Sequence, residues 1–181
     1  MNLNKLKEEV YKNAVEHGWY EEERSENHWL CLVIADLIKA MEADKIGKYA
    51  DCKQFENYMR MKERSEDEFI YAFKHEIKGT VEDKLADACI LLLNFAGIEQ
   101  ETLEDTEEYY SAKDFSNETF IESIFDMINT VTEYWQYFDI SLILNTIFTF
   151  CRRQSIDIKW HIIQKIKYNR YSSHKHRNRK C

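Results

Sequence analysis

The feature that most constrains the fold of this chain is its shortage of turn-forming residues. Its 181 residues contain no proline and only four glycines, at positions 18, 47, 79 and 97. Sheets with many strands need frequent turns, and glycine and proline are the residues that most turn types favour. Apolar residues make up 44% of the chain, which is enough to form a packed core. We therefore expect one all-α domain that spans residues 1–181.

Apolar residues spaced three and four apart, together with capping residues, predict where the helices lie. Ser25 is an expected N-cap, and the capping-box sequence SEDE at residues 65–68 is expected to open another helix. The last helix is expected to end near Tyr171, so that residues 171–181 form an extended basic tail. The expected helices cover residues 3–18, 26–46, 50–63, 66–79, 81–97, 117–135, 140–154 and 156–171.

Charge is distributed unevenly along the chain. Fifteen Lys/Arg stand against thirty-two Asp/Glu before Arg152, a net charge of −17, whereas the remainder has ten against one, a net charge of +9. Because so acidic a body repels a phosphate backbone, we expect no nucleic-acid partner. The basic tail has two interpretations that stay open: it contacts phosphate, or it is a solvated end that pairs with the acidic body.

Cysteine usage and hydropathy indicate where the protein resides. The five cysteines are scattered and form no CxxC pair, which is typical of reduced thiols. No apolar run approaches the roughly 20 residues that span a bilayer, and the first ten residues, MNLNKLKEEV, lack the apolar stretch of a signal peptide. We expect a cytoplasmic protein without membrane association.

Two expected helices carry closely spaced carboxylates. Asp36 and Glu42 lie in the stretch DLIKAMEAD, and Asp83 and Asp87 lie in VEDKLADACI. Residues three or four apart share a helix face, and carboxylates that face one another across a bundle attract Mg²⁺. The same spacing is also common on ordinary solvated helix faces. Lys39 complicates the pattern, because an ammonium group only donates hydrogen bonds and does not ligate a cation.

Four stretches carry a resemblance to a known family. They are GWYEEERS at 18–25, ADLIKAMEA at 35–43, EDKLADACI at 82–90 and KIKYNRYSSHKHRNRK at 165–180. Together they resemble the all-α nucleoside triphosphate pyrophosphohydrolases, the MazG-like and dCTPase-like group. Relative to the shorter members of that group, residues 98–140 look like an inserted helical segment.

The resemblance implies a fold, a reaction and a cofactor. The implied fold is the helical bundle of that family, assembled as a homodimer or homotetramer. The implied reaction converts a (d)NTP and water to a (d)NMP and pyrophosphate. The implied cofactor is Mg²⁺, held by four acids on two neighbouring helices. In this sequence the four positions are Asp36, Lys39, Lys84 and Asp87, so two of the four acids are replaced by lysine.

The resemblance also implies roles for individual residues. The expected catalytic residues are Asp36, Glu42, Asp83 and Asp87. The metal ligands are expected among Asp36, Asp87 and Glu42. The expected substrate-binding residues are Trp19, Arg24, Lys39, Lys84, Lys165, Asn169 and His176.

Three interpretations of the two lysines compete. In the first, Glu42, Glu82 and Asp83 supply replacement oxygens and Mg²⁺-dependent hydrolysis survives. In the second, Lys39 and Lys84 neutralise the phosphates in place of the metal, so that nucleotide binds without turnover. In the third, the lysines and aspartates form a purely structural ion-pair network. Four carboxylates carry a charge of −4, whereas two aspartates and two lysines carry none, so the electrostatic attraction for a divalent cation is reduced.

Overall fold

The computed structural model describes residues 2–16, 18, 24–61, 64–104, 114–137 and 139–177, with side chains up to residue 172. Within these residues the chain forms eight helices and no strand, which confirms the all-α prediction. The helices are α1 (Leu3–Glu16), α2 (Glu26–Lys45), α3 (Cys52–Arg60), α4 (Glu66–Glu76), α5 (Val81–Ile98), α6 (Phe120–Trp135), α7 (Ile140–Arg153) and α8 (Ile158–Arg177).

Several helices begin where the sequence predicts. The Ser25 hydroxyl accepts a hydrogen bond from the backbone N–H of His28 and caps α2. Ser65 and Glu68 form the complete capping box that opens α4. Each cap supplies an acceptor for a backbone N–H that has no partner within its own helix. The local sequence therefore fixes these helix starts.

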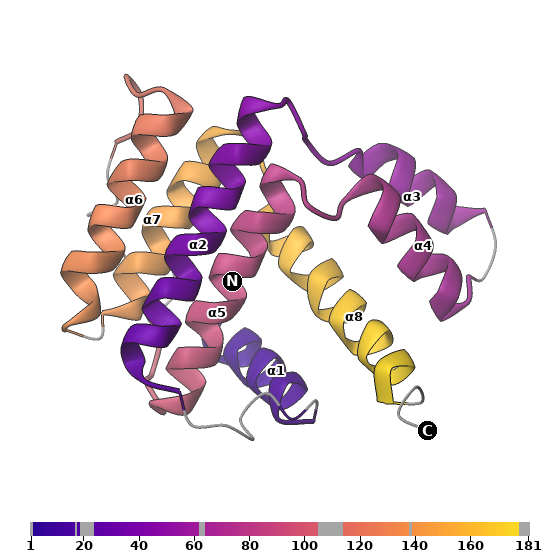
Figure 1. The fold of residues 1–181 in the computed structure, drawn as a ribbon, viewed down its shortest axis with the longest axis horizontal. Coiled ribbons are helices and arrows are strands. Elements are labelled where there is room, and N and C mark those ends of the chain that lie inside the picture. The colour runs from indigo at the N-terminus through magenta and orange to yellow at the C-terminus, as the bar shows by residue number, and fades with distance from the viewer. Residues whose placement is uncertain are drawn as a thin grey trace.

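Helix α5 is the centre of the bundle. It contacts α1, α2, α7 and α8, and every residue from Leu85 to Ala96 except the partly exposed Asp87 is buried. Because α5 is apolar on most of its circumference, neighbouring helices must cover it on several sides. Figure 1 shows this arrangement, with α2 in front of α5 and α7 behind.

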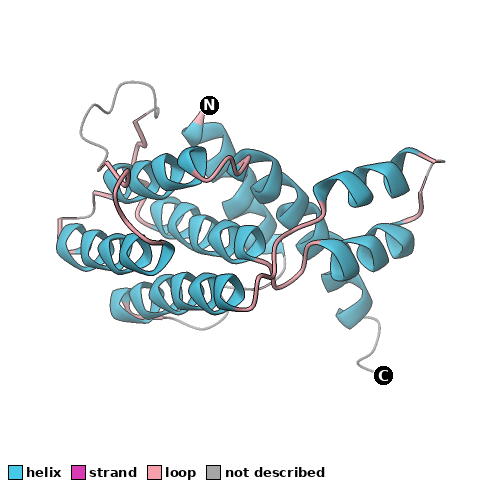
Figure 2. Ribbon diagram, turned by 90° about the horizontal axis from the view of Figure 1, so that it is seen from above, coloured by secondary structure: helices cyan, strands magenta, loops and turns pink. Residues whose placement is uncertain are grey.

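A second, aromatic cluster lies outside the bundle. Helices α3 and α4 pack together as an arm to one side, and α4 contacts α8 (Figures 1 and 2). Phe55, Phe69 and Phe73 of the arm pack with Tyr168 of α8, and the Phe73 and Tyr168 rings stack with centroids 4.4 Å apart. Helix α8 therefore belongs both to the bundle and to the arm.

Two predicted helix ends are wrong. Gly97 does not end its helix but lies inside α5, where a Cβ atom would come within 2.7 Å of the Tyr11 ring. Because Gly97 has no side chain, Tyr11 of α1 packs directly against the backbone of α5 at this position. Helix α5 continues to Ile98. Helix α8 continues to Arg177 instead of giving way to an extended tail near Tyr171. No glycine or proline follows Ile156 to stop it.

Residues in the predicted insertion take part in the core. Ile124, Met127 and Val131 of α6 are buried, and α6 contacts both α2 and α7. Whether residues 98–140 are an insertion relative to the resembled family stays a prediction. None of the helices in the described ranges combines the length and the apolar character needed to cross a membrane.

A candidate site built from lysines and aspartates

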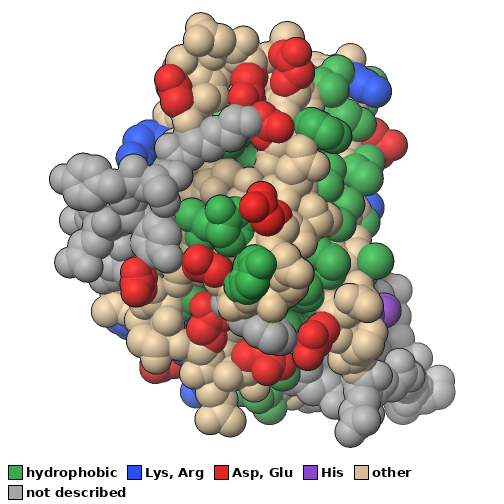
Figure 3. Space-filling model, turned by 90° about the vertical axis from the view of Figure 1, so that its left-hand side faces the viewer, with side chains coloured by type: hydrophobic (Ala, Val, Ile, Leu, Met, Phe, Trp, Pro, Cys, Tyr) green, Lys and Arg blue, Asp and Glu red, His purple; other side chains and the backbone are tan. Residues whose placement is uncertain are grey.

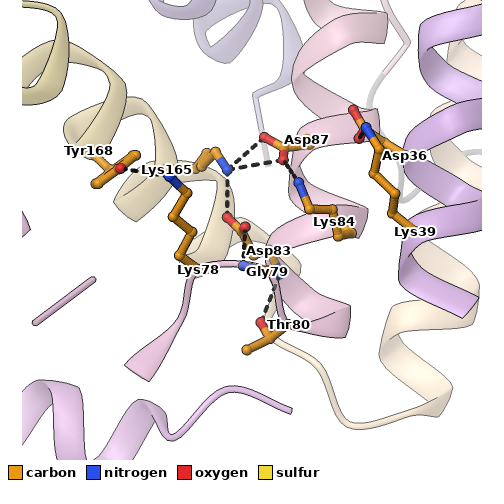
Figure 4. A network of polar contacts seen from close by, with 10 residues as sticks. All are labelled: Asp36, Lys39, Lys78, Gly79, Thr80, Asp83, Lys84, Asp87, Lys165 and Tyr168. Carbon is orange, nitrogen blue, oxygen red and sulfur yellow. Dashed lines mark hydrogen bonds and ion pairs between the residues drawn. The ribbon is translucent and has the colours of Figure 1, made fainter. Parts of the chain in front are cut away.

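Charged side chains from three helices meet on one side of α5. Asp83, Lys84 and Asp87 lie on α5 itself, Lys165 reaches them from α8, and α2 contributes a neighbouring pair, Asp36 and Lys39 (Figure 4). We call these six residues the lysine–aspartate network. Asp83 and Asp87 lie on the same face of α5, as their spacing predicts, because both contact the ammonium group of Lys165.

Lys165 is the most deeply buried cation of the network. Its side chain is 8% exposed, and its Nζ lies 2.6 Å from Asp83 Oδ1 and 2.9 Å from Asp87 Oδ1. Burial by itself lowers the pKa of this ammonium group, but the charges of Asp87 and Asp83 outweigh that effect and hold the pKa above its usual value. Lys165 therefore stays charged and joins α8 to α5.

Asp83 is held in place by the start of its own helix. The Thr80 hydroxyl caps α5 by accepting a hydrogen bond from the Asp83 N–H, at 3.2 Å. The second carboxylate oxygen of Asp83 accepts a hydrogen bond from the Gly79 N–H, at 2.7 Å. Both carboxylate oxygens are thus engaged, one by the backbone and one by Lys165.

Two further ion pairs complete the network, each between residues three apart on one helix. Lys84 Nζ lies 2.7 Å from Asp87 Oδ2, and Lys39 Nζ lies 2.9 Å from Asp36 Oδ1. Burial raises the pKa of the Asp36 carboxyl, the hydrogen bond from Lys39 opposes that rise, and the charge of Asp87 adds to it. The influence of Asp87 on Asp36 shows that the pairs on α2 and α5 lie within electrostatic reach of each other.

This arrangement does not fit Mg²⁺. Each of the three aspartates is engaged by a lysine ammonium group, and three charges of each sign cancel. Among the residues that the structure describes, no three Asp, Glu, His or Cys side chains are placed to hold a metal ion together. A divalent cation needs several free oxygen ligands at one point. Here Lys165 and the Gly79 N–H engage the two oxygens of Asp83, Lys84 and Lys165 engage those of Asp87, and Lys39 engages one oxygen of Asp36.

The two glutamates considered as replacement ligands lie elsewhere. Glu82 is buried, and its Oε2 accepts a hydrogen bond from the Ala50 N–H at 2.9 Å, which ties α5 to the segment before α3. Glu42 is exposed on α2, where its charge contributes to the raised pKa of Lys39, after the larger effect of Asp36. Glu82 thus has a structural partner, and Glu42 borders the network from the solvent side.

The remaining predicted substrate-binding residues are spread over the molecule. Trp19 lies outside the described residues, and of His176 only the backbone, within α8, is described. The Arg24 guanidinium lies 5.7 Å from the centroid of the Trp29 ring at the start of α2. Asn169 is partly buried on α8, one turn after Lys165. Of the predicted set, the structure brings together Asp36, Lys39, Lys84 and Lys165 with Asp83 and Asp87 in the network.

Sequence reasoning missed two features of the site. It placed Lys165 among the substrate-binding residues, whereas the structure pairs Lys165 with two aspartates about eighty positions away. It also missed Lys78, which lies beside Lys165 in Figure 4 and donates a hydrogen bond to the Tyr168 hydroxyl at 3.2 Å. The i,i+3 spacing of Lys165 and Tyr168 places both on one face of α8, but it does not indicate that Lys78 and the aspartates of α5 lie opposite them.

Comparison of this chain with protein-family models, with curated proteins and with solved structures found no match. The resemblance to the pyrophosphohydrolases consequently rests on the four sequence stretches.

The lysines of the network differ in how far water reaches their ammonium groups: the Lys39 side chain is 52% exposed and that of Lys84 is 21% exposed. Such groups bind anionic oxygen atoms as point charges.

Proposed function

We propose that this protein is a nucleoside triphosphate pyrophosphohydrolase-like protein with a remodelled magnesium site, and that lysine ammonium groups hold the nucleotide's phosphates where the metal would act. One observation carries the proposal: Lys39 and Lys84, at two of the four family acid positions, each pair with the aspartate at the adjoining position. Positive charge therefore stands where the family's acids would place a cation.

The exposure of the lysines suggests the order in which phosphate engages them. Lys39 is the most exposed of the three, so an incoming phosphate competes with Asp36 for it at the lowest cost in desolvation. Lys84 is less exposed, and Lys165 is buried between two aspartates. In this proposal Lys39 and Lys84 bind phosphate, while Lys165 keeps α5 and α8 in register.

The same geometry argues against efficient hydrolysis. The reaction that the resemblance implies, (d)NTP and water to (d)NMP and pyrophosphate, depends on Mg²⁺, and the carboxylates of the network do not fit that ion as arranged. We propose that turnover is weak or lost and that nucleotide binding is retained. A purely structural network is the second candidate, and the burial of Lys165 between two helices favours it.

Thermal unfolding in EDTA tests this function. A (d)NTP that binds only the folded protein raises its melting temperature in proportion to the logarithm of concentration. We expect stabilisation by at least one of a panel of (d)NTPs, and an at least fivefold weaker effect in Lys39→Ala. Lys74→Ala, which removes an exposed lysine from α4, is the matched control. If no nucleotide raised the melting temperature of the protein, nucleotide binding would be ruled out and only the purely structural network would remain.

Pyrophosphate release from the same panel, with Mg²⁺ or Mn²⁺ present, measures the remaining activity. We expect little or no release. Turnover at a rate typical of enzymes, about 1–10³ per second, would show that the metal displaces the lysines. A homodimer or homotetramer and a cytoplasmic location complete the proposal, and both rest on the sequence.

A further inference from the structure

The chain leaves α5 through a short segment that is fixed at its first turn. We call residues 99–104 the exit segment. The Glu101 N–H donates a hydrogen bond to the Ala96 carbonyl at 2.9 Å, and Gln100 lies in the left-handed region with φ 56°. This is a common closing turn of a helix, in which the last carbonyls accept hydrogen bonds from beyond the helix end. The exit segment therefore leaves α5 in one defined direction.

Helix α1 holds the exit segment on one side. The Asn4 side chain makes two hydrogen bonds to the backbone of Leu103, donating to its carbonyl at 2.7 Å and accepting from its N–H at 2.9 Å. The Lys7 ammonium group donates a hydrogen bond to the Glu101 carbonyl at 2.6 Å. The Leu103 side chain is buried, so apolar packing adds to these contacts.

Helix α7 holds the exit segment on the other side. The Glu104 N–H donates a hydrogen bond to the Ser141 hydroxyl at 3.1 Å. The side-chain carboxyl group of Glu101 accepts a hydrogen bond from the N–H of Ile140, the first residue of α7. Asp139 is the N-cap of the same helix. Two carboxyl groups therefore lie near the start of α7, one from its own cap and one from the exit segment.

The surroundings of the Glu101 carboxyl group disfavour its charged form. One of its oxygens, Oε2, is enclosed and has no hydrogen-bond partner among the residues that the structure describes. Lys7 brings a positive charge near this carboxyl group, but Asp139 and Glu99 bring negative ones. Figure 3 shows a wider acidic surplus, because acidic side chains predominate on the side of the molecule where α6 lies and basic ones lie near its edges. An enclosed carboxyl group among acids favours the neutral, protonated form.

We propose that Glu101 is a pH-sensitive contact between the end of α5 and the start of α7. With a proton bound, its neutral carboxyl group stays enclosed, and the exit segment keeps its hydrogen bonds to α1 and α7. When the proton leaves for solvent, an enclosed negative charge remains beside Asp139, with one oxygen unpartnered in the part of the chain that the structure describes. Detachment of the exit segment brings this carboxylate into water, at the cost of the contacts with Asn4 and Ser141.

The direction of the pH dependence follows from the two states of this carboxyl group. Burial raises the pKa of Glu101 from its usual 4.5 to about 7 while the segment is attached, and the hydrogen bond from the Ile140 N–H only partly opposes that rise. In the detached segment the group is solvated and keeps its usual pKa. Attachment is therefore strongest below pH 4.5, weakens as the pH rises toward 7 and stays weak above it. Across this window the attachment equilibrium should change by about two orders of magnitude.

This inference goes beyond the proposed function and does not depend on nucleotide binding. Glu101 follows the C-terminal end of α5, whereas Asp83 and Asp87 of the lysine–aspartate network lie in its first two turns. A protein that binds no nucleotide would still show the pH dependence of the exit segment, and the reverse also holds.

Hydrogen exchange on the full chain gives the first test. The Leu103 N–H reports attachment because it bonds to Asn4, and Glu101→Gln keeps the side chain neutral at every pH. The ratio of the Leu103 exchange rate in the parent to that in Glu101→Gln removes the pH dependence of the exchange chemistry itself. We expect this ratio to rise at least tenfold between about pH 5 and about pH 8.

The matched control for hydrogen exchange is Glu104→Gln, which removes an exposed acid from the same segment. It should keep the pH dependence of the parent. A ratio for Glu101→Gln that does not change with pH, or an equal effect of the two substitutions, would overturn the proposal.

Titration of the carboxyl group tests the proposal without relying on detachment. Carboxyl-carbon NMR follows Glu101 in the parent, and the absence of its signal in Glu101→Gln assigns it. We expect a midpoint near pH 7. Lys7→Met should raise the midpoint because it removes a positive charge beside the carboxyl group, whereas Lys5→Met, at an exposed lysine of α1, should leave it unchanged. A midpoint near pH 4.5 would show that the carboxyl group is solvated in the folded protein and would overturn the proposal.

Discussion

The two ends of the lysine–aspartate network contain similar ion pairs in opposite surroundings. At the α5–α8 junction the Lys165 side chain is 8% exposed and that of Asp83 is 0% exposed. On α2 the Lys39 side chain is 52% exposed beside Asp36. A pair in water is screened and contributes little, whereas removing one partner of a buried pair leaves an uncompensated charge. The ion pairs of the α5–α8 junction should therefore contribute most to the free energy of unfolding, and the pair on α2 should remain free to exchange partners.

The largest expected effect comes from Lys165→Met. This change leaves Asp83 and Asp87 buried without their shared cation, so we expect the free energy of unfolding to fall by about 3–5 kcal/mol. Urea denaturation measures it. Adding Asp83→Asn and Asp87→Asn to Lys165→Met should restore part of the loss. A loss below about 1 kcal/mol would place the junction in the same class as a surface pair.

A second buried group on α8 shows what happens where burial outweighs the nearby charge. His161 lies one turn before Lys165 and is 3% exposed, with its Nε2 3.5 Å from Cys52 Sγ. Burial lowers the pKa of His161 to about 4. Two titratable groups on one helix thus respond to burial differently, because Lys165 is hydrogen-bonded to two carboxylates whose charges outweigh burial, whereas the charge of Asp157 only partly offsets the burial of His161.

The titration of His161 gives the second prediction. The unfolded chain takes up a proton near pH 6.5 and the folded protein only near pH 4, so stability should fall as the pH drops through that window. The shift corresponds to a loss on the order of 3 kcal/mol below pH 4. His161→Gln should lose less stability over this window than the parent does. The exposed His75→Gln variant is the control, and identical pH profiles for the parent and His161→Gln would refute the assignment.

The smallest effect is expected at the exposed end of the network. Lys39→Met should change the free energy of unfolding by only about 0–1 kcal/mol, because water screens the lost pair. The urea titration used for Lys165→Met gives the direct comparison. If Lys39→Met matched Lys165→Met, the contrast between the two ends of the network would be wrong.

Sequence reasoning succeeded where the determinants are local. The caps at Ser25 and Ser65 predicted helix starts because each hydroxyl accepts a hydrogen bond from a backbone N–H only three residues further on. It failed where distant segments meet. Gly97 lies inside α5 because Tyr11 of α1 packs against it, and Lys165 contacts an aspartate 82 positions away. No spacing rule within one helix predicts such contacts.

The candidate site was predictable in part for the same reason. Asp83 and Asp87 were expected on one face, and the pairs of Lys39 with Asp36 and of Lys84 with Asp87 follow from i,i+3 spacing. Glu82 sits in the same acidic cluster but turns to the Ala50 N–H, because the segment before α3 passes beside the start of α5. Which carboxylates face the network depends on packing that only the fold defines.

The double variant Lys39→Glu with Lys84→Glu tests the central claim most directly, since it restores acids at both positions where lysine stands. Its network keeps Lys165, but its net charge is four units more negative than in the parent, because two positive charges are lost and two negative ones are added. Magnesium titration calorimetry measures the consequence. The account predicts Mg²⁺ binding at least tenfold tighter than in the parent protein. Unchanged Mg²⁺ affinity would contradict the claim that the lysines stand in place of the metal.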